Sequence, residues 1–409
     1  MATRWVGMRP RTAGRGRFRG SASGFVLVVV AAWSVSLAPA AQAASPSANA
    51  DVTYMADAQV RAIQPAGGRI WIGGAFGHLL TSSGGTGPAV PGIAALDPVT
   101  GAPAGGVSLP ALGGGGRFIY DFALSGNVLY AAGKFTYQSG GKTYKNLVGL
   151  NAQTGAIVSR FNAPSLRCVW ATSTRVLVGG SRLRAYSPGG AKIGSFHELV
   201  PKIDNSLRGH NTPSLIRDIE VSGTTAFAVG QFDFINGQPK KVAVKFDPST
   251  GNVSSWKVGA VDQQSGAFGI QLEIAGSRLY VAAGGSDFTA AYSVADGHQY
   301  WKTDTSGSTQ TVVSWDANTL VIGGHFQWVE FQGSGTCGDN KHPNTDCLHQ
   351  PRLAILDAST GHVDTGWRPE ICCLYNGVWK LAVDAGRLHV GGQFTKAGGR
   401  SQKFYARFS

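Results

Sequence analysis

Short apolar runs of β-strand type recur along this chain, separated by polar stretches rich in turn residues. Each run ends at a small residue and glycine, in most cases followed by one further residue and Phe. No helical stretch lies between them, and a repeat of this kind predicts a β-propeller or a β-solenoid. The seven instances are residues 70–76, 129–135, 176–180, 226–232, 279–284, 320–326 and 388–394.

The glycine pairs could also be interpreted as phosphate-binding loops. Such a loop leads into the N-terminus of a helix, whereas here Phe and a polar, turn-rich stretch follow. We therefore assign the glycines a structural role. Glycine at a strand end permits a bulge or the close approach of a neighbouring backbone, and the Phe is expected to fill the space between stacked units.

A second mark follows most of these runs and predicts a tight turn between two strands. It contains Asp or Asn, which can bond the backbone two residues on, and Gly, which takes the left-handed position that closes a hairpin. The next strand usually carries an aromatic residue such as Phe161, Trp256, Trp301 or Trp367. The clearest copies of this turn are residues 96–101, 150–155, 246–251 and 356–361.

These marks describe a unit of four strands, in which an inner strand precedes the glycine-ended strand and a further strand lies on each side of the Asp turn. Seven such units fit residues 51–409, and six is the competing count. The fold class we predict is all-β, a single β-propeller with seven four-stranded blades. The last unit stops one strand short, so we expect residues 51–55 to supply it, because a closed ring removes exposed sheet edges.

The first 43 residues have the pattern of a cleaved secretion signal. Residues 1–24 carry six Arg and no acid, 25–37 form an apolar run, and cleavage is expected after Ala43. The apolar run is shorter than the ~20 residues that span a membrane comfortably. We expect a signal peptide at 1–43, a linker at 44–50 and the propeller at 51–409, in a secreted, extracellular or cell-wall-associated protein.

Charge excludes some classes of partner. Removing the signal lowers the formal net charge from +13 to +7, because six arginines leave with it. No stripe of Lys and Arg remains that would indicate nucleic-acid binding, and no second apolar segment predicts a membrane span. We expect a monomer whose partner is a cell-surface glycan or a protein.

All five cysteines lie in the expected exported part, where disulfides are plausible. Cys337 and Cys347 lie inside the longest insertion, between Gln327 and Pro351, and a bridge between them would restrain that loop. The alternative is a zinc site, but its spacing matches none of the usual zinc patterns, so we expect no metal. That site would use Cys337, His342, Cys347 and His349, and the pairing of Cys168, Cys372 and Cys373 stays open.

Strand direction places all five cysteines on one face, together with the loops that vary most in length. Function concentrates on variable loops held by a rigid scaffold, so this face is the expected binding surface. The alternative is that its aromatic residues only pack the long insertion down. The residues expected to be neighbours there are His325, Trp328, Phe331, Cys372, Cys373 and Tyr375.

Charged residues are also expected in the central channel. Asp121, Asp218 and Lys380 occupy equivalent places on three inner strands when the glycine-ended strands are aligned. They could bind an ion or a ligand, but charged inner residues are more often solvated by channel water and paired with one another.

The whole pattern of Gly-Gly-x-Phe, a loop, Leu-Asp, Thr-Gly and an aromatic resembles the delta-60 repeat β-propellers of secreted bacterial proteins, a family of largely unknown function. The resemblance covers nearly the whole chain after the signal, with clean matches in the first, second, fourth and sixth units. It implies a propeller and export, and no catalytic residues. We expect a secreted, non-catalytic binding or scaffold module that uses no cofactor.

A second resemblance leaves an enzyme as the alternative. Residues 291–302 look like a repeat of the pyrroloquinoline-quinone propellers, and the adjacent Cys372 and Cys373 are similar to the vicinal disulfide beside the quinone in those dehydrogenases. The calcium ligands of such an enzyme cannot be placed in this sequence. A carbohydrate-active hydrolase is the other enzyme considered, because propeller glycosidases use acids on inner strands; here these would be Asp121, Asp218 and Glu273.

Overall fold

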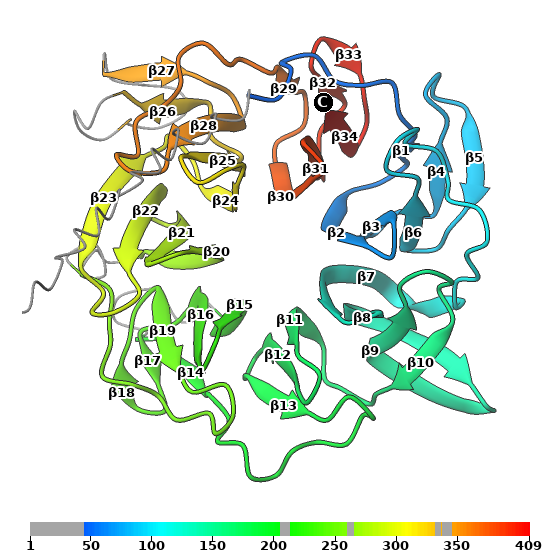
Figure 1. Cartoon of the computed structure of the whole chain (residues 1–409), viewed down its shortest axis with the longest axis horizontal. Coiled ribbons are helices and arrows are strands. Elements are labelled where there is room, and N and C mark those ends of the chain that lie inside the picture. Colours follow the sequence, from blue (N-terminus) through cyan, green and yellow to red (C-terminus); the bar gives the residue numbers. More distant parts are fainter. Residues whose placement is uncertain (1–44, 205–212, 260–265, 332–336, 338–345) are drawn as a thin grey trace, which may run out of the picture. The chain divides into compact units, whose positions relative to one another are not determined.

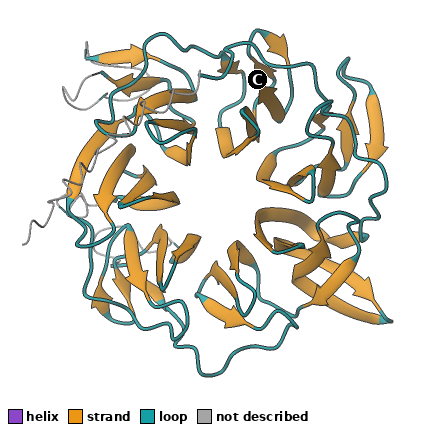
Figure 2. Cartoon of the chain, in the orientation of Figure 1, coloured by secondary structure: helices purple, strands orange, loops and turns teal. Residues whose placement is uncertain are grey.

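The computed structural model describes residues 45–204, 213–259, 266–331, 337 and 346–409. These residues form strands and loops without a helix (Figure 2). None of the described residues belongs to a helix long and apolar enough to cross a membrane. The expected signal peptide and His342 lie outside the described residues.

Each of the seven glycine-ended runs forms the second strand of a separate sheet, hydrogen-bonded to the inner strand that precedes it. The seven inner strands are β2 (Val60–Ala66), β7 (Leu112–Ser125), β11 (Leu166–Ala171), β15 (Leu215–Ser222), β20 (Phe268–Ala275), β24 (Thr309–Ser314) and β30 (Gly377–Asp384). Their partners are β3 (Arg69–Gly74), β8 (Val128–Ser139), β12 (Val176–Gly180), β16 (Thr225–Gln231), β21 (Arg278–Gly284), β25 (Thr319–Gly324) and β31 (Arg387–Gln393).

A third strand follows in each sheet, and a fourth strand in two of them. The third strands are β6 (Ile93–Leu96), β9 (Lys142–Asn151), β13 (Arg184–Tyr186), β19 (Ala243–Phe246), β22 (Phe288–Ser293), β28 (Leu353–Asp357) and β34 (Tyr405–Phe408). The fourth strands are β10 (Ile157–Arg160) and β23 (Gln299–Asp304).

The expectation of four strands in every sheet is therefore wrong for the other five sheets. In four of these, the chain makes one isolated bridge after the turn and then leaves the sheet, as between Leu96 and Pro103 or Leu356 and Val363. In each of these four the fourth strand is reduced to a single pairing position. In the first sheet this position is Pro103, which has no N–H to continue a ladder.

The inner strands contact one another in sequence order, and β30 of the last sheet contacts β2 of the first. Figure 1 shows these strands facing a common centre, with the other strands of each sheet further out. The hydrophobic cores lie between adjacent sheets and are filled by the residues of the repeat. Phe76, Phe232, Phe326 and Phe394 are fully buried there.

The glycines are required by close packing between sheets. A Cβ on Gly73 would lie 2.6 Å from the side chain of Ile119 on the next inner strand, and a Cβ on Gly74 would lie 2.1 Å from the carbonyl oxygen of Gln59. Both distances are too short for a side chain. The glycines therefore have the structural role that the sequence predicts.

The Asp turns also have the predicted chemistry. Oδ1 of Asp97 accepts hydrogen bonds from the backbone N–H groups of Val99 and Thr100, at 2.9 and 2.7 Å. Asn151 accepts the same pair of bonds in the next sheet. Bonds from Thr100 lower the pKa of Asp97, so this carboxylate serves the turn.

The N-terminal segment lies beside the third strand of the last sheet, but residues 51–54 do not form the predicted strand. The short strand β1 (Met55–Ala56) pairs with β4 (His78–Leu80) instead. Its backbone bonds to the last sheet are isolated rather than a ladder: Ser47 N–H donates to the carbonyl of Ser409 at 2.7 Å, and Asp51 N–H donates to that of Arg407 at 2.8 Å.

The residues expected to be a linker are packed rather than free. Ala50 is buried in the core of the last sheet, and the carbonyl of Pro46 accepts a hydrogen bond from the indole of Trp367 at 2.6 Å. Within 45–50 the composition resembles a linker, but the backbone of Ala50 lies so close to Gly398 that position 398 has no room for a Cβ.

Among the described residues, four short additional sheets lie at the end of the main sheets where the glycine-ended strands finish. Each contains a hairpin that directly follows a glycine-ended strand in the chain. Two-residue turns close two of them, Asn236-Gly237 and Gly398-Gly399, all with positive φ. The strands are β1 and β4 with β5 (Thr86–Ala89); β14 (Pro201–Lys202), β17 (Phe234–Ile235) and β18 (Gln238–Pro239); β26 (Trp328–Glu330) and β27 (Cys347–His349); and β29 (Ile371–Cys372), β32 (Lys396–Ala397) and β33 (Arg400–Ser401).

Candidate functional site

A β-bulge interrupts every one of the seven inner strands at an equivalent place, near the end of the partner strand; a glycine pair lies opposite it in four of the sheets. In β7, for example, Ile119 pairs with Gly133 and Asp121 pairs with Ala132, which leaves Tyr120 as the extra residue. A bulge changes the direction of side chains along a strand. The residues at this extra position are Arg61, Tyr120, Arg167, Arg217, Ile270, Gln310 and Trp379.

All seven bulge residues line one cavity on the axis, which we call the mouth cavity. Residues that directly follow a bulge line it as well, among them Asp121, Asp218, Gln271 and Lys380. Strict alternation would turn one of two consecutive side chains away from the axis. The bulge therefore brings two layers of side chains to the axis where an unbroken strand would present one.

The second layer links neighbouring sheets. Its side chains accept hydrogen bonds from the backbone N–H of the next inner strand. Asp121 Oδ2 accepts from Val169 at 3.0 Å, and Asp218 Oδ2 accepts from Leu272 at 3.0 Å. Gln271 and Thr311 do the same for Val312 and Leu381, at 3.1 and 3.2 Å.

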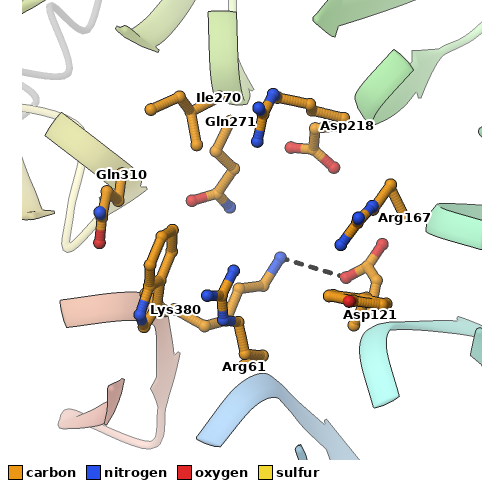
Figure 3. A pocket seen from close by; sticks show the side chains of 11 residues that line it. Arg61, Asp121, Arg167, Asp218, Ile270, Gln271, Gln310 and Lys380 are labelled. Carbon is orange, nitrogen blue, oxygen red and sulfur yellow. Dashed lines mark hydrogen bonds and ion pairs between the residues drawn. The ribbon is translucent and has the colours of Figure 1, made fainter. Parts of the chain in front are cut away.

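The three charged residues named from the sequence, Asp121, Asp218 and Lys380, all lie in this second layer. Nζ of Lys380 is 3.4 Å from Oδ1 of Asp121 (Figure 3). Burial alone lowers the pKa of Lys380, but the carboxylates of Asp121 and Asp218 outweigh it and raise that pKa. Burial raises the pKa of Asp218 to about 7, against the opposing effect of Lys380.

A second cavity continues along the axis and shares Asp121, Asp218, Gln271 and Lys380 with the first. Two further acids line it, each two residues beyond the second-layer residue of its strand. Glu220 accepts from the N–H of Ile274 at 2.7 Å, and Glu273 from that of Ser314 at 3.4 Å. Burial is the largest cause that raises the pKa of both, to about 9 for Glu220.

Three arginines dominate the mouth cavity. The guanidinium of Arg61 lies 3.4 Å from the centre of the Trp379 ring, Arg167 lies 4.2 Å from that of Tyr120, and Arg217 lies 5.2 Å from that of Phe268. Arg61 and Arg167 reach into the cavity from separate strands (Figure 3). These contacts are cation–π interactions, which orient a guanidinium without neutralising it.

Within the described part of the chain, none of these arginines pairs with a carboxylate. Arg61 donates to Gln59 at 3.4 Å and Arg217 to Gln231 at 3.0 Å, both neutral amides. The Nε of Arg217 is buried without a hydrogen-bond partner. Burial, with repulsion from the neighbouring arginines, lowers the pKa of Arg61 and of Arg217 to about 10, so these two remain charged at neutral pH.

The mouth cavity lies at the end of the axis that carries the additional hairpins, because the bulges face the ends of the second strands, after which those hairpins begin. Gln310 connects it to the loop residues. Its amide hydrogen-bonds Nδ1 of His325 at 3.1 Å, and the ring of His325 stacks on Tyr375 with centroids 5.5 Å apart. Tyr375 is 76% exposed, and burial lowers the pKa of His325.

The other aromatic residues expected in this cluster form a second contact. Trp328, on β26, lies 4.7 Å from the ring of His349, on β27, and Phe331 follows β26 with 37% of its surface exposed. The structure thus pairs His325 with Tyr375 and Trp328 with His349. A groove beside His349 is also lined by Arg352, Arg368, Glu370 and Cys372, among others.

The cysteines form two disulfides. The expected Cys337–Cys347 bridge is confirmed, which excludes a zinc site built on those two thiolates. Cys372 bonds to Cys373, and Cys168 is free and buried. The expectation that all five lie on one face is wrong, because Cys168 belongs to the second layer of the channel and packs against Gly179 and Ile216 of the core.

Among the described residues, no group of three His, Cys, Asp or Glu side chains could hold a metal ion. The sequence had pointed to the second-layer charges, but it missed the bulge residues, above all the three arginines. The sequence marks these arginines only by their position, because each comes directly before a second-layer residue. Alternation along a strand directs attention away from them.

No protein-family model matches the chain, and no curated protein matches it. Solved structures match in fold. U3-55K has a TM-score of 0.55 at 9% identity, with 89% of this chain and 99% of that one covered. The WD40 β-propeller domain of Doa1 has a TM-score of 0.52 at 10% identity, with 88% and 96% covered. The RRP9 WD40 repeats have a TM-score of 0.52 at 10% identity, with 90% and 99% covered. At these identities the likeness concerns the fold alone, which is that of a β-propeller.

Proposed function

We propose that this protein is a secreted, monomeric, non-catalytic binding module of the delta-60 repeat type, built as one closed seven-bladed propeller. It holds a glycan or cell-wall polymer at the face that carries the two disulfides. Seven sheets with contacting inner strands, and an N-terminal segment bonded to the last sheet, support the ring. The signal-like N-terminus supports export.

The observation that carries the binding role is the exposed ring of Tyr375, which stacks on His325 beside an open cavity. An aromatic ring with one apolar face free to solvent and the other supported is suited to packing on a ligand. His325 is neutral at neutral pH, since its pKa is lowered, so the platform is not itself charged.

A binding role is favoured over catalysis because the channel acids serve the fold. Asp121, Asp218, Glu220 and Glu273 each accept a backbone N–H from the next inner strand. A carboxylate engaged in this way is a structural link between sheets.

Co-sedimentation with purified cell walls and a panel of insoluble polysaccharides tests this proposal, with released sugar assayed in parallel. We expect binding that is lost in Tyr375→Ala and reduced in Trp328→Ala. Tyr300→Ala is the matched control, because Tyr300 is also an exposed tyrosine beside a histidine, His298, but lies on the outer strand β23.

Binding to none of the polymers would contradict the proposal, and so would equal losses in the Tyr375 and Tyr300 variants. Release of sugar would replace the binding module with a hydrolase.

A further inference from the structure

We propose that the mouth cavity is an anion-binding site that receives a carboxylate or phosphate group from an acidic cell-surface glycan. The inference rests on the proposed function and deepens it, because it names the chemistry of the ligand and the residues that read it. Arg61, Arg167 and Arg217 are the groups that would contact the anion.

The first argument is the unbalanced charge of the cavity. Its lining holds four cations and two carboxyl groups. Lys380 is already engaged by Asp121 at 3.4 Å, which leaves the three arginines and Asp218. Three guanidinium groups converging on one cavity repel one another, and a bound anion would relieve that repulsion.

The second argument is the orientation of the arginines. Arg61 and Arg167 are fixed by stacking on Trp379 and Tyr120. Among the described contacts Arg61 donates only through Nε, to Gln59, so terminal N–H groups of both guanidinium groups remain available while their faces are occupied. Planar guanidinium groups recognise carboxylate and phosphate through two parallel hydrogen bonds. Preorganised donors of this kind lose little side-chain entropy when the anion binds.

The third argument concerns access. The cavity lies on the axis, and Gln310, His325 and Tyr375 form a connected path from its lining to an exposed ring. A slender chain can place one residue on Tyr375 and direct a charged group of the same or the next residue into the cavity. A sugar unit with an acidic substituent fits this path, since its ring offers an apolar face to Tyr375 and its acid reaches the arginines.

Calorimetric titration of the purified protein distinguishes the sources of the anion. The probes are a uronic-acid oligosaccharide, a glycerol-phosphate oligomer, a neutral oligosaccharide of similar length and a peptide of Asp and Glu. We expect one or both acidic polymers to bind, with affinity that falls as NaCl is raised. The neutral oligosaccharide should bind at least tenfold more weakly.

Arg167→Gln is the decisive variant, because the described contacts of this guanidinium are limited to the Tyr120 ring, so the change breaks no described hydrogen bond or ion pair. We expect it to weaken binding of the acidic oligomer about tenfold or more. Arg278→Gln is the control because it removes the same charge. Arg278 also stacks on a tyrosine, Tyr300, but lies outside the cavity.

Several outcomes would overturn the inference. Equal binding of neutral and acidic oligosaccharides, an unchanged affinity in Arg167→Gln, or an equal loss in Arg278→Gln would each show that the arginines do not read an anion. Preferential binding of the acidic peptide would replace the glycan with a protein partner. In any of these cases the Tyr375-dependent sedimentation can still stand, whereas its absence would remove the proposed function itself.

Discussion

Asp51 and Arg407 are joined by two hydrogen bonds across 356 residues of chain. The backbone N–H of Asp51 donates to the carbonyl of Arg407 at 2.8 Å, and its carboxylate accepts from Nε of the same residue at 2.6 Å. In four other sheets the equivalent backbone bond is made by the sheet's own chain, for example by Asp364 N–H to the carbonyl of Ile355. The N-terminal segment therefore stands where a fourth strand would begin.

Trp367 independently supports the conclusion that the N-terminal segment takes the place of sheet residues in the last sheet. The indoles of Trp256 and Trp301 donate to carbonyls at the end of the third strand of the next sheet, those of Ser293 and Ala358. The indole of Trp367 donates to Pro46. In the last sheet, the N-terminal segment thus offers the acceptor that the end of the third strand offers elsewhere.

Removing the Asp51 carboxylate should destabilise the protein. Arg407 is 6% exposed, so Asp51→Ala leaves a buried guanidinium without its carboxylate, and we expect a loss of about 1–3 kcal/mol in the free energy of unfolding. Urea unfolding measures it. Asp364→Ala is the control, because its side chain bonds only the nearby Gly366 N–H; a similar loss in both variants would contradict the closing role of Asp51.

Stability should fall as the pH rises toward neutrality. A carboxyl whose pKa is higher in the folded protein binds its proton more tightly there, and this tighter binding adds to the free energy of unfolding. For Asp218 the added stability is complete below pH about 4 and is lost as the pH rises through about 7. Asp218→Asn keeps an acceptor for Leu272 but cannot ionise. We expect the difference in unfolding free energy between pH 5 and pH 8 to shrink by more than about 1 kcal/mol in this variant.

The measurement is urea unfolding of both proteins at several pH values. Glu220 and Glu273 contribute in the same direction, since burial raises their pKa as well, so the variant should retain part of the slope. Parallel curves for the two proteins would show that Asp218 ionises alike in the folded and unfolded states.

Thiol labelling should find one cysteine that reacts only after unfolding. Cys168 is 1% exposed, and burial raises its pKa well above the usual value, while the other four cysteines form disulfides. We expect no rapid alkylation of the native protein, one label in denaturant and five after reduction, read by intact mass. Three labels in denaturant without reductant would contradict one of the two bridges.

The sequence by itself determined the repeat. Strand runs that end in glycine, Asp turns such as that at Asp97 and Phe residues such as Phe76 depend on local backbone geometry and on burial. Both leave a mark in most copies, so the all-β architecture and the role of the glycines could be predicted. The Cys337–Cys347 bridge could be predicted because both cysteines lie in one long insertion. Asp121, Asp218 and Lys380 were likewise found by alignment of the copies.

Only the tertiary structure decided which side chains meet on the axis. The bulge before each second-layer residue depends on the partner strand, and it turns Arg61, Arg167 and Arg217 into the mouth cavity where alternation alone would direct them away. The packing of Ala50, the bond between Asp51 and Arg407 and the separate pairing of Trp328 and Tyr375 arise from contacts between distant segments. Such contacts follow from how sheets pack, and no local pattern of residues encodes them.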